Sequence, residues 1–416
     1  MYNIVLFLIL LFIVLDFAIE RTLAWLNAKK IGISIPKELS GIYDDEKYKK
    51  QQQYSLVNHK FGVLSSSFDF AILVIMFSFG LFGVIDDFLR LYIENEILLT
   101  LAFFGILFIC DDILGTPFDY YHTFVIEEKF EFNKVTPKLF WVDKLKNLLL
   151  TVLLGGGLLT LITFIYQMVP EYFWILAWTL VSCVSVFLMM FYSEWIVPLF
   201  NKQVPLEEGE LRSKIEDFSV KAGFDLKNIY VIDGSKRSTK ANAYFSGLGS
   251  KKRIVLYDTL VNDFTPDEIV AVLAHEIGHY KKKHTLISLV ISLLSSLIMF
   301  ALLGLFLGNP LIAQALGATI SSFHLGILVF GILYTPISTV LNIGINVLSR
   351  KHEYEADAYA AKFGLANDLI NALKKLSAKS LTNLQPHTAY VFVHYSHPTL
   401  LERVQAITKI TNEESN

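Results

Sequence analysis

Long apolar runs are the feature of this sequence that most restricts its fold. A helix of about 17 to 25 apolar residues spans a hydrocarbon core of about 30 Å, and the chain has seven runs of this kind. Only 18% of its residues are charged, whereas soluble domains carry about a quarter. The sequence therefore predicts a polytopic membrane protein with seven spans, at 3–19, 66–85, 97–115, 147–168, 173–199, 285–308 and 322–346. The first run lacks a basic leader and a small-residue cleavage site, so we expect it to be a retained anchor.

The Lys and Arg residues support this count and give the spans an orientation. On one side there are eight, five, fourteen and eight basic residues in 20–65, 116–146, 200–284 and 347–416. On the other side there are one, none and none in 86–96, 169–172 and 309–321. Because cytoplasmic loops are enriched in basic residues, we expect the N-terminus outside and the long 200–284 connection and the C-terminal tail in the cytoplasm.

Charge and cysteine content exclude several classes of partner. The net charge is −3 and no domain is basic, so we expect no nucleic-acid partner. Cys110 and Cys183 lie in apolar runs, which predicts buried small hydrophobes and no disulfide. Acidic residues within the spans or at their rims indicate a polar interior among the helices or, equally, headgroup-level positions; they are Asp16, Asp69, Asp111, Asp112 and Glu194.

The long cytoplasmic connection has the pattern of a small mixed domain. A polar helical stretch opens it, and three short runs of β-branched and aromatic residues follow at 228–233, 241–247 and 253–260. The next stretch, TPDEIVAVLAHEIGHY, begins with Thr265 as a helix N-cap, Pro266 at the first helical position and Glu268 completing a capping box. HEIGH is therefore expected on a helix, and that helix could continue into the sixth span.

Within this helix, HEIGH has the spacing of a metal site. His275 and His279 are four residues apart, so they share one helix face and both can reach a zinc ion at about 2.0–2.1 Å. Glu276 lies one step round the helix, where it can take a proton from a water that the metal activates. The pattern H-E-x-x-H predicts a zinc-dependent hydrolase with Glu276 as general base.

A catalytic zinc needs a third protein ligand, and the tail offers candidates. HEYEAD places Glu353 and Asp357 four residues apart on one face of a second helix, which emerges from the seventh span. One carboxylate could bind zinc while the other bonds the free N–H of His275 or His279. His352 is a weaker candidate, and Glu355 points to another face and is expected to be solvated. His284 is expected on the opposite side of the HEIGH helix from His279, which makes it a poor ligand.

Taken together, these motifs resemble the type I CAAX prenyl endopeptidases, a family of integral-membrane zinc metalloproteases. The resemblance runs nearly end to end. It rests on HEIGH, on SRKHEYEADAYA and HYSHPTLLERVQAI, and on TFVIEEKFEFNK, WIVPLFNK and SKRSTKANAYFSG, at 123–134, 195–202 and 235–247. After HEIGHY this chain passes through KKKH directly into the sixth span, a compact form that would suit a bacterial member.

This resemblance implies a fold and a set of roles. The fold is an all-α polytopic membrane protein, with seven transmembrane helices forming a barrel around a large chamber and a small α+β metallopeptidase domain on the cytoplasmic face. One Zn²⁺ per chain would be held by His275, His279 and Glu353. Glu276 would act as base and His397 as donor to the oxyanion, Asp357 and Arg403 would support the site, and Asn242, Ala243, Tyr244 and Phe245 would line the substrate cleft.

The expected organisation has four segments. Residues 1–199 carry helices one to five, 200–284 the sheet and the HExxH helix, 285–346 helices six and seven, and 347–416 the third zinc ligand. We expect a monomer in the endoplasmic reticulum membrane or a bacterial inner membrane, acting on membrane-associated or C-terminally prenylated peptides and proteins. Two alternatives remain open: a quality-control metalloprotease of membrane proteins, and a transporter or channel that binds zinc.

Overall fold

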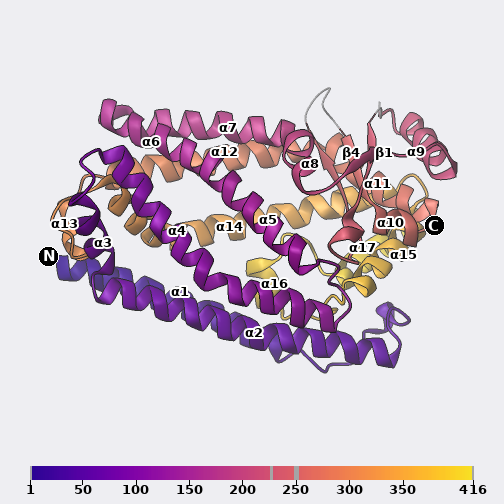
Figure 1. The fold of residues 1–416 in the computed structure, drawn as a ribbon. Helices are drawn as coiled ribbons and strands as arrows, with labels where there is room; N and C mark the ends of the chain where they lie inside the picture. Colours follow the sequence, from indigo (N-terminus) through magenta and orange to yellow (C-terminus); the bar gives the residue numbers. More distant parts are fainter. Residues whose placement is uncertain (1, 225–227, 248–252, 415–416) are drawn as a thin grey trace.

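Long helices dominate the structure, a computed structural model that describes residues 2–224, 228–247 and 253–414 (Figure 1). Within that part, six helical segments are long and apolar enough to cross a membrane: Asp45–Ser78, Glu96–Glu127, Pro137–Met168, Pro170–Phe200, His284–Phe306 and Phe323–Ala361. They contain α2 (Asp45–Ser78), α4 (Glu96–Tyr121), α5 (Pro137–Leu150), α6 (Gly157–Met168), α7 (Phe173–Trp195), α12 (His284–Phe306) and α14 (Phe323–Ala361). Helix α1 (Tyr2–Ala28) covers the first predicted span and packs along α2.

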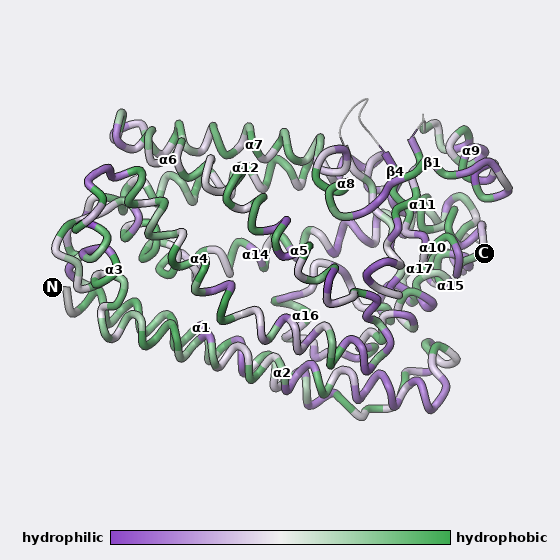
Figure 2. Tube along the Cα trace, viewed as in Figure 1, coloured by the Kyte–Doolittle hydropathy of each residue, from purple (hydrophilic) through white to green (hydrophobic). Residues whose placement is uncertain are grey.

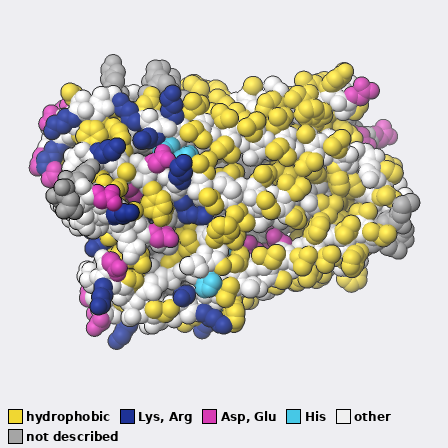
Figure 3. Space-filling view, turned by 180° about the vertical axis from the view of Figure 1, so that it is seen from behind, with side chains coloured by type: hydrophobic (Ala, Val, Ile, Leu, Met, Phe, Trp, Pro, Cys, Tyr) yellow, Lys and Arg dark blue, Asp and Glu magenta, His cyan; other side chains and the backbone are white. Residues whose placement is uncertain are grey.

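The membrane helices are packed as a wall and not as a solid bundle. Between 6% and 17% of the residues in each apolar segment are buried, whereas the helices of a solid bundle bury an apolar stripe against one another. The hydrophobic surface covers one long part of the molecule and gives way to charged residues at one end (Figures 2 and 3). Cys110 and Cys183 are exposed on these helices, so the prediction that they are buried was wrong.

Acidic side chains of the spans are exposed or paired. Asp112 contacts Lys144 at 2.8 Å, and Glu194 pairs with Arg253. Asp69 and Asp111 are exposed although they lie within membrane helices. Because a carboxylate at that depth is costly unless it meets water or a partner, their exposure fits a water-filled interior.

The charged end contains the small sheet and its helices. The strands are β1 (Gln203–Pro205), β2 (Ile229–Ile232), β3 (Ala243–Ser246) and β4 (Arg253–Tyr257), in the order β1-β2-β4-β3. Strands β2 and β4 are parallel, with Ile229 opposite Ile254, and β3 is antiparallel to β4, with Ala243 opposite Leu256. The sequence predicted three of these strands and missed β1. The helices of this end are α8 (Val197–Phe200), α9 (Glu210–Lys221), α10 (Asp258–Asp263), α11 (Pro266–Lys281), α15 (Ala366–Lys379) and α17 (Leu400–Glu414). Helix α16 (Thr388–His394) packs against α14 and α1.

Two predicted helix boundaries differ from the structure. The second span was predicted to reach residue 85, but α2 ends at Ser78 and a left-handed Gly80 redirects the chain into α3 (Leu81–Arg90). A Cβ on Gly83 would lie 2.5 Å from the Ala318 nitrogen, so only glycine allows α3 to approach the segment after α13 (Pro310–Ala315) this closely. Likewise, α11 does not continue into the sixth span, because the backbone turns at Lys283 with φ of 61°.

Candidate active site

Helix α11 begins with the capping box that the sequence predicted. The Thr265 hydroxyl accepts the Glu268 N–H at 3.3 Å, and the Glu268 carboxylate accepts the Thr265 N–H at 2.9 Å. Pro266 occupies the first turn. These interactions satisfy two of the free N–H groups at the helix start and fix the rotation of α11. Its buried face, which includes Ile269, Leu273 and Ile277, packs into the largely apolar core of the charged end.

Gly278, the small residue of HEIGH, sets how closely α11 approaches α14. A Cβ at this position would lie 3.0 Å from the Tyr359 Cβ and 3.1 Å from the Ala356 Cα. Real Cβ atoms rarely come this close to a neighbour, so a larger residue would push the helices apart. The close crossing is what brings residues of the α14 C-terminal end to the two histidines.

Three side chains converge at this crossing. The Nε2 atoms of His275 and His279 are 3.1 Å apart. Glu353 lies 3.4 Å from His275 Nε2 through one oxygen and 3.2 Å from His279 Nε2 through the other. Ligands at 2.0–2.1 Å from a tetrahedral zinc ion are about 3.3 Å from one another. The observed separations match that geometry.

The chemistry of these atoms also fits a metal. The three ligand atoms lie within 4.8 Å of one another, and among the described residues this is the cluster of His, Cys, Asp and Glu that could hold an ion. The Glu353 Oε2 atom is buried and has no well-aligned hydrogen bond; His275 Nε2 and Arg403 Nη1 each lie 3.4 Å from it. A buried carboxylate oxygen without a well-aligned hydrogen bond is costly, and a bound cation would satisfy it. Two imidazoles and a carboxylate form one of the ligand sets of catalytic zinc.

His275 is held from behind by an ion pair. Its Nδ1 lies 2.8 Å from Asp357, and Arg403 donates two hydrogen bonds to the same carboxylate, at 2.9 and 2.6 Å. Burial lowers the pKa of His275, but hydrogen bonds to Asp357 and Glu353 outweigh it and raise this pKa to about 9. Of the two partners the sequence left open for Asp357, the structure selects His275.

His279 is held by His284, which was predicted to lie on the opposite side of the helix. Because the helix breaks at Lys283, His284 folds back and places its Nδ1 3.0 Å from the Nδ1 of His279. The other nitrogen of His284 lies 3.1 Å from Glu355, and its ring stacks on His352 at 3.9 Å. His284 therefore supports His279 and does not face away from it, and Glu355 is partnered and not simply solvated. The sequence shows three lysines and a histidine at the entry to an apolar span, but nothing in it marks the turn at Lys283 that brings His284 back.

Glu276 and His397 approach the same space from two elements. Glu276 is half-buried on α11, and among the described residues none donates a hydrogen bond to its carboxylate. His397 lies in the turn before α17, with its Nε2 3.3 Å from Glu353 and its side chain 61% exposed. Both groups are thus beside the three ligand atoms and open to a substrate.

The predicted substrate segment is an edge strand. Strand β3 pairs with β4 on one side, and no strand of the described chain pairs with its other side. Asn242 accepts the Tyr257 N–H at 3.0 Å, which anchors the start of the strand. A cavity of about 820 Å³ lies beside it, lined by Tyr244 and Phe245 of β3, Tyr192 of α7 and other residues. The strand contacts α11, so an extended chain at this edge could lead to the HEIGH helix.

Comparisons with known proteins agree with this geometry. The family model described as "CAAX prenyl protease N-terminal, five membrane helices" matches residues 25–202, and the model of peptidase family M48 matches residues 205–411. The chain is 34% identical to CAAX prenyl protease 1 of Saccharomyces cerevisiae, over 97% of this chain and 95% of the yeast protein. A homologue from Arabidopsis thaliana is 37% identical (98% and 97%), and one from Homo sapiens is 33% identical (91% and 89%).

Solved structures give the same result. The crystal structure of S. mikatae Ste24p superposes with a TM-score of 0.91 at 35% identity, covering 97% of this chain and 98% of that one. This match confirms the predicted fold class, a seven-helix membrane barrel around a chamber with a small α+β unit at one end. The helix cap, the ligand geometry and the matches over the whole length lead to one conclusion: the chain is an integral-membrane metalloendopeptidase of peptidase family M48, belonging with the CAAX prenyl proteases.

Proposed function

We propose that the chain is a zinc endopeptidase that cleaves C-terminally prenylated, CAAX-type proteins at the cytoplasmic face of its membrane. The observation that carries this proposal is the match between the 3.1–3.4 Å separations of the His275, His279 and Glu353 ligand atoms and a tetrahedral zinc site. Names of the relatives support the substrate class. The distribution of basic residues supports the orientation, in a bacterial inner membrane or the endoplasmic reticulum.

Each residue has a separate task in this proposal. His275, His279 and Glu353 would hold Zn²⁺, which would polarise the scissile carbonyl and lower the pKa of water. Glu276 takes the proton of the attacking water and passes it to the leaving amine, since no residue of the described chain donates a hydrogen bond to its carboxylate. His397 donates a hydrogen bond to the carbonyl oxygen as negative charge develops on it.

Substrate position follows from the edge strand. The peptide adds to β3 by main-chain hydrogen bonds, along Asn242, Ala243, Tyr244 and Phe245. Asp357 and Arg403 keep the His275 imidazole in the orientation that points Nε2 at the metal. The site needs no residue from a second chain, so we propose that the monomer is active.

Cleavage of a fluorogenic peptide that carries a farnesylated cysteine near its C-terminus tests the proposal. Wild type, Glu276→Gln and chelator-treated protein are compared in detergent, with the unprenylated peptide as second substrate. Asp267→Asn is the matched control, because it removes a carboxylate from the exposed side of the same helix. We expect cleavage by wild type and Asp267→Asn, and a loss of about 10²–10⁴-fold in Glu276→Gln.

The outcomes separate the parts of the proposal. Full activity after chelation, or in Glu276→Gln, would refute the metal-dependent mechanism. Equal cleavage of both peptides would keep the endopeptidase and remove the prenyl specificity, which favours a quality-control role. Bound zinc without cleavage of either peptide would leave the metal site in place and refute the CAAX-type substrate.

A further inference from the structure

A polar cavity far along the chain from the HEIGH motif has no role in the chemistry above. It has a volume of about 440 Å³ and lies between α1, α2 and the segment that joins α15 to α16. Among the side chains that line it, none is Asp or Glu. The polar and ionisable residues that could meet a ligand there include Arg21, Asn27, Asn58, His59, Asn383 and Tyr390.

Arg21 is the charged group of this cavity and is poorly satisfied by the protein. Its Nη1 makes one long hydrogen bond, 3.4 Å to the Gly62 carbonyl, and its Nε is buried without a partner. No carboxylate of the described chain forms an ion pair with it. The adjacent Glu20 does not line the cavity and lies 3.5 Å from His394. Removing a guanidinium partly from water without an anion beside it costs free energy. The cavity therefore lacks the negative partner that would offset this cost.

The amides of the cavity are oriented as donors. The Asn27 side-chain oxygen accepts the His387 N–H at 3.0 Å, and that of Asn383 accepts the Gln385 N–H at 3.0 Å. These bonds occupy both oxygens and leave both side-chain NH₂ groups available. His59 lines the same cavity as Arg21. Two amide donors, a guanidinium and an imidazole, with no carboxylate in the lining, form an environment for an anion.

The position of the cavity along the membrane helices indicates which kind of anion it binds. On α1 the apolar run ends at Ile19, and Arg21 is the first basic residue after it. One and two turns further on, Trp25 is 52% exposed and Lys29 lies over its ring at 3.4 Å. An exposed Trp beside basic residues is typical of the membrane interface, where lipid phosphates lie. We propose that this cavity binds the phosphate of an anionic membrane lipid through Arg21, Asn27 and Asn383.

Such a site would join the two halves of the molecule. Its donors come from α1, in the N-terminal membrane half, and from the segment before α16, which leads to His397. A bidentate arginine–phosphate contact fixes both distance and direction. The lipid would therefore hold the C-terminal segment against the α1–α2 pair, so its binding stabilises the folded chain by mass action.

Thermal unfolding of the delipidated full chain in detergent tests the proposal. The protein is titrated with phosphatidylglycerol, phosphatidylcholine or inorganic phosphate, and native mass spectrometry counts bound lipid. Variants are Arg21→Gln, Asn383→Ala and, as control, Lys29→Gln, which removes a positive charge directly after the end of α1 and outside the cavity. We expect phosphatidylglycerol to raise Tm saturably in wild type and Lys29→Gln, with half-saturation raised about tenfold or more in Arg21→Gln, since a tenfold loss corresponds to about 1.4 kcal/mol.

Three results would overturn the proposal. An unchanged lipid titration in Arg21→Gln would show that the guanidinium does not bind the headgroup. An equal shift with inorganic phosphate would assign the cavity to free phosphate, and a similar loss in Lys29→Gln would reduce the effect to general surface charge. If Arg21→Gln does not fold, Asn383→Ala carries the decision, because it removes one donor and leaves the charge in place.

Discussion

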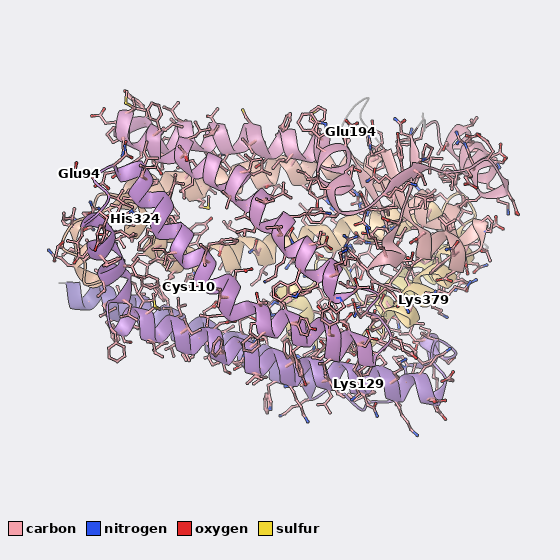
Figure 4. All side chains as sticks on the ribbon, in the orientation of Figure 1. Glu94, Cys110, Lys129, Glu194, His324 and Lys379 are labelled. Carbon is pink, nitrogen blue, oxygen red and sulfur yellow. The ribbon has the colours of Figure 1, made fainter. Side chains whose placement is uncertain are left out.

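Helix α14 carries a buried ion network at each of its ends, and the two networks differ in one respect. At the start of the helix, His324 and Asp86 are both fully buried and lie 2.7 Å apart, at the end remote from the sheet (Figure 4). Arg90 binds Asp86 at 3.0 Å and Glu96 at 2.6 Å. At the other end, Glu353 is also buried, but its Oε2 has only long contacts, at 3.4 Å to His275 and 3.4 Å to Arg403.

The difference separates a structural network from a functional one. Burying charges costs several kcal/mol unless each is paired. The Asp86 network pairs its charges and so ties α3, α4 and α14 together. The Glu353 network instead points two imidazole nitrogens and a carboxylate at one point, 3.1–3.4 Å apart, and leaves one carboxylate oxygen with long contacts only. A bound cation would satisfy that oxygen.

The variant Glu353→Gln is the strongest test of the functional network, because it removes a proposed zinc ligand. Full zinc ligand sets supply about 10–16 kcal/mol, so loss of one ligand should weaken zinc binding by about 4 kcal/mol, roughly a thousandfold. Metal analysis after dialysis against a chelator measures this, and cleavage should fall with it. Glu355→Gln, two residues away, is the control. Full zinc retention in Glu353→Gln would remove it from the ligand set.

Asp86→Asn tests the structural network at the start of α14. We expect the free energy of unfolding to fall by about 3 kcal/mol, because Arg90 and His324 lose a buried charged partner. Thermal unfolding measures the loss, and zinc content should stay unchanged. If zinc were lost while Tm stayed the same, the structural assignment of this network would be wrong.

Asp357→Asn probes the support behind His275. Removing the charge weakens the orientation of the imidazole, and such outer contacts typically contribute 10–100-fold to metal affinity. A competition titration with a chromogenic chelator gives the value. An affinity within twofold of wild type would mean that Arg403 and packing hold His275 without the carboxylate.

The smallest effect is expected for His284→Phe, which removes the acceptor for the His279 Nδ1–H. We expect about tenfold weaker zinc binding, at the lower end of outer-contact effects. His352→Phe is the matched control, because it keeps a ring stacked on His284. Equal losses in both variants would assign the effect to ring packing instead of the hydrogen bond.

Much of this site could be predicted because its signals are local. The i, i+4 spacing of His275 and His279, the capping box at Thr265 and the second pair at Glu353 and Asp357 each depend on a few neighbouring residues. The His284 contact could not be predicted by the same reasoning, because it depends on whether the helix continues through Lys283. The helical periodicity of the sequence does not indicate that the backbone turns at Lys283.

The sequence by itself determined the membrane class, the number of spans, the HEIGH helix and the candidate ligands, because hydrophobic length and helical period are properties of contiguous residues. The tertiary structure decided which candidates meet. Gly278 sets the approach of α11 to α14, which brings Asp357 to His275, and the turn at Lys283 brings His284 to His279. It also paired Asp86 with His324, 238 residues later, and left Arg21 without an anion. Such pairings depend on how helices cross in three dimensions, and no local pattern records that geometry.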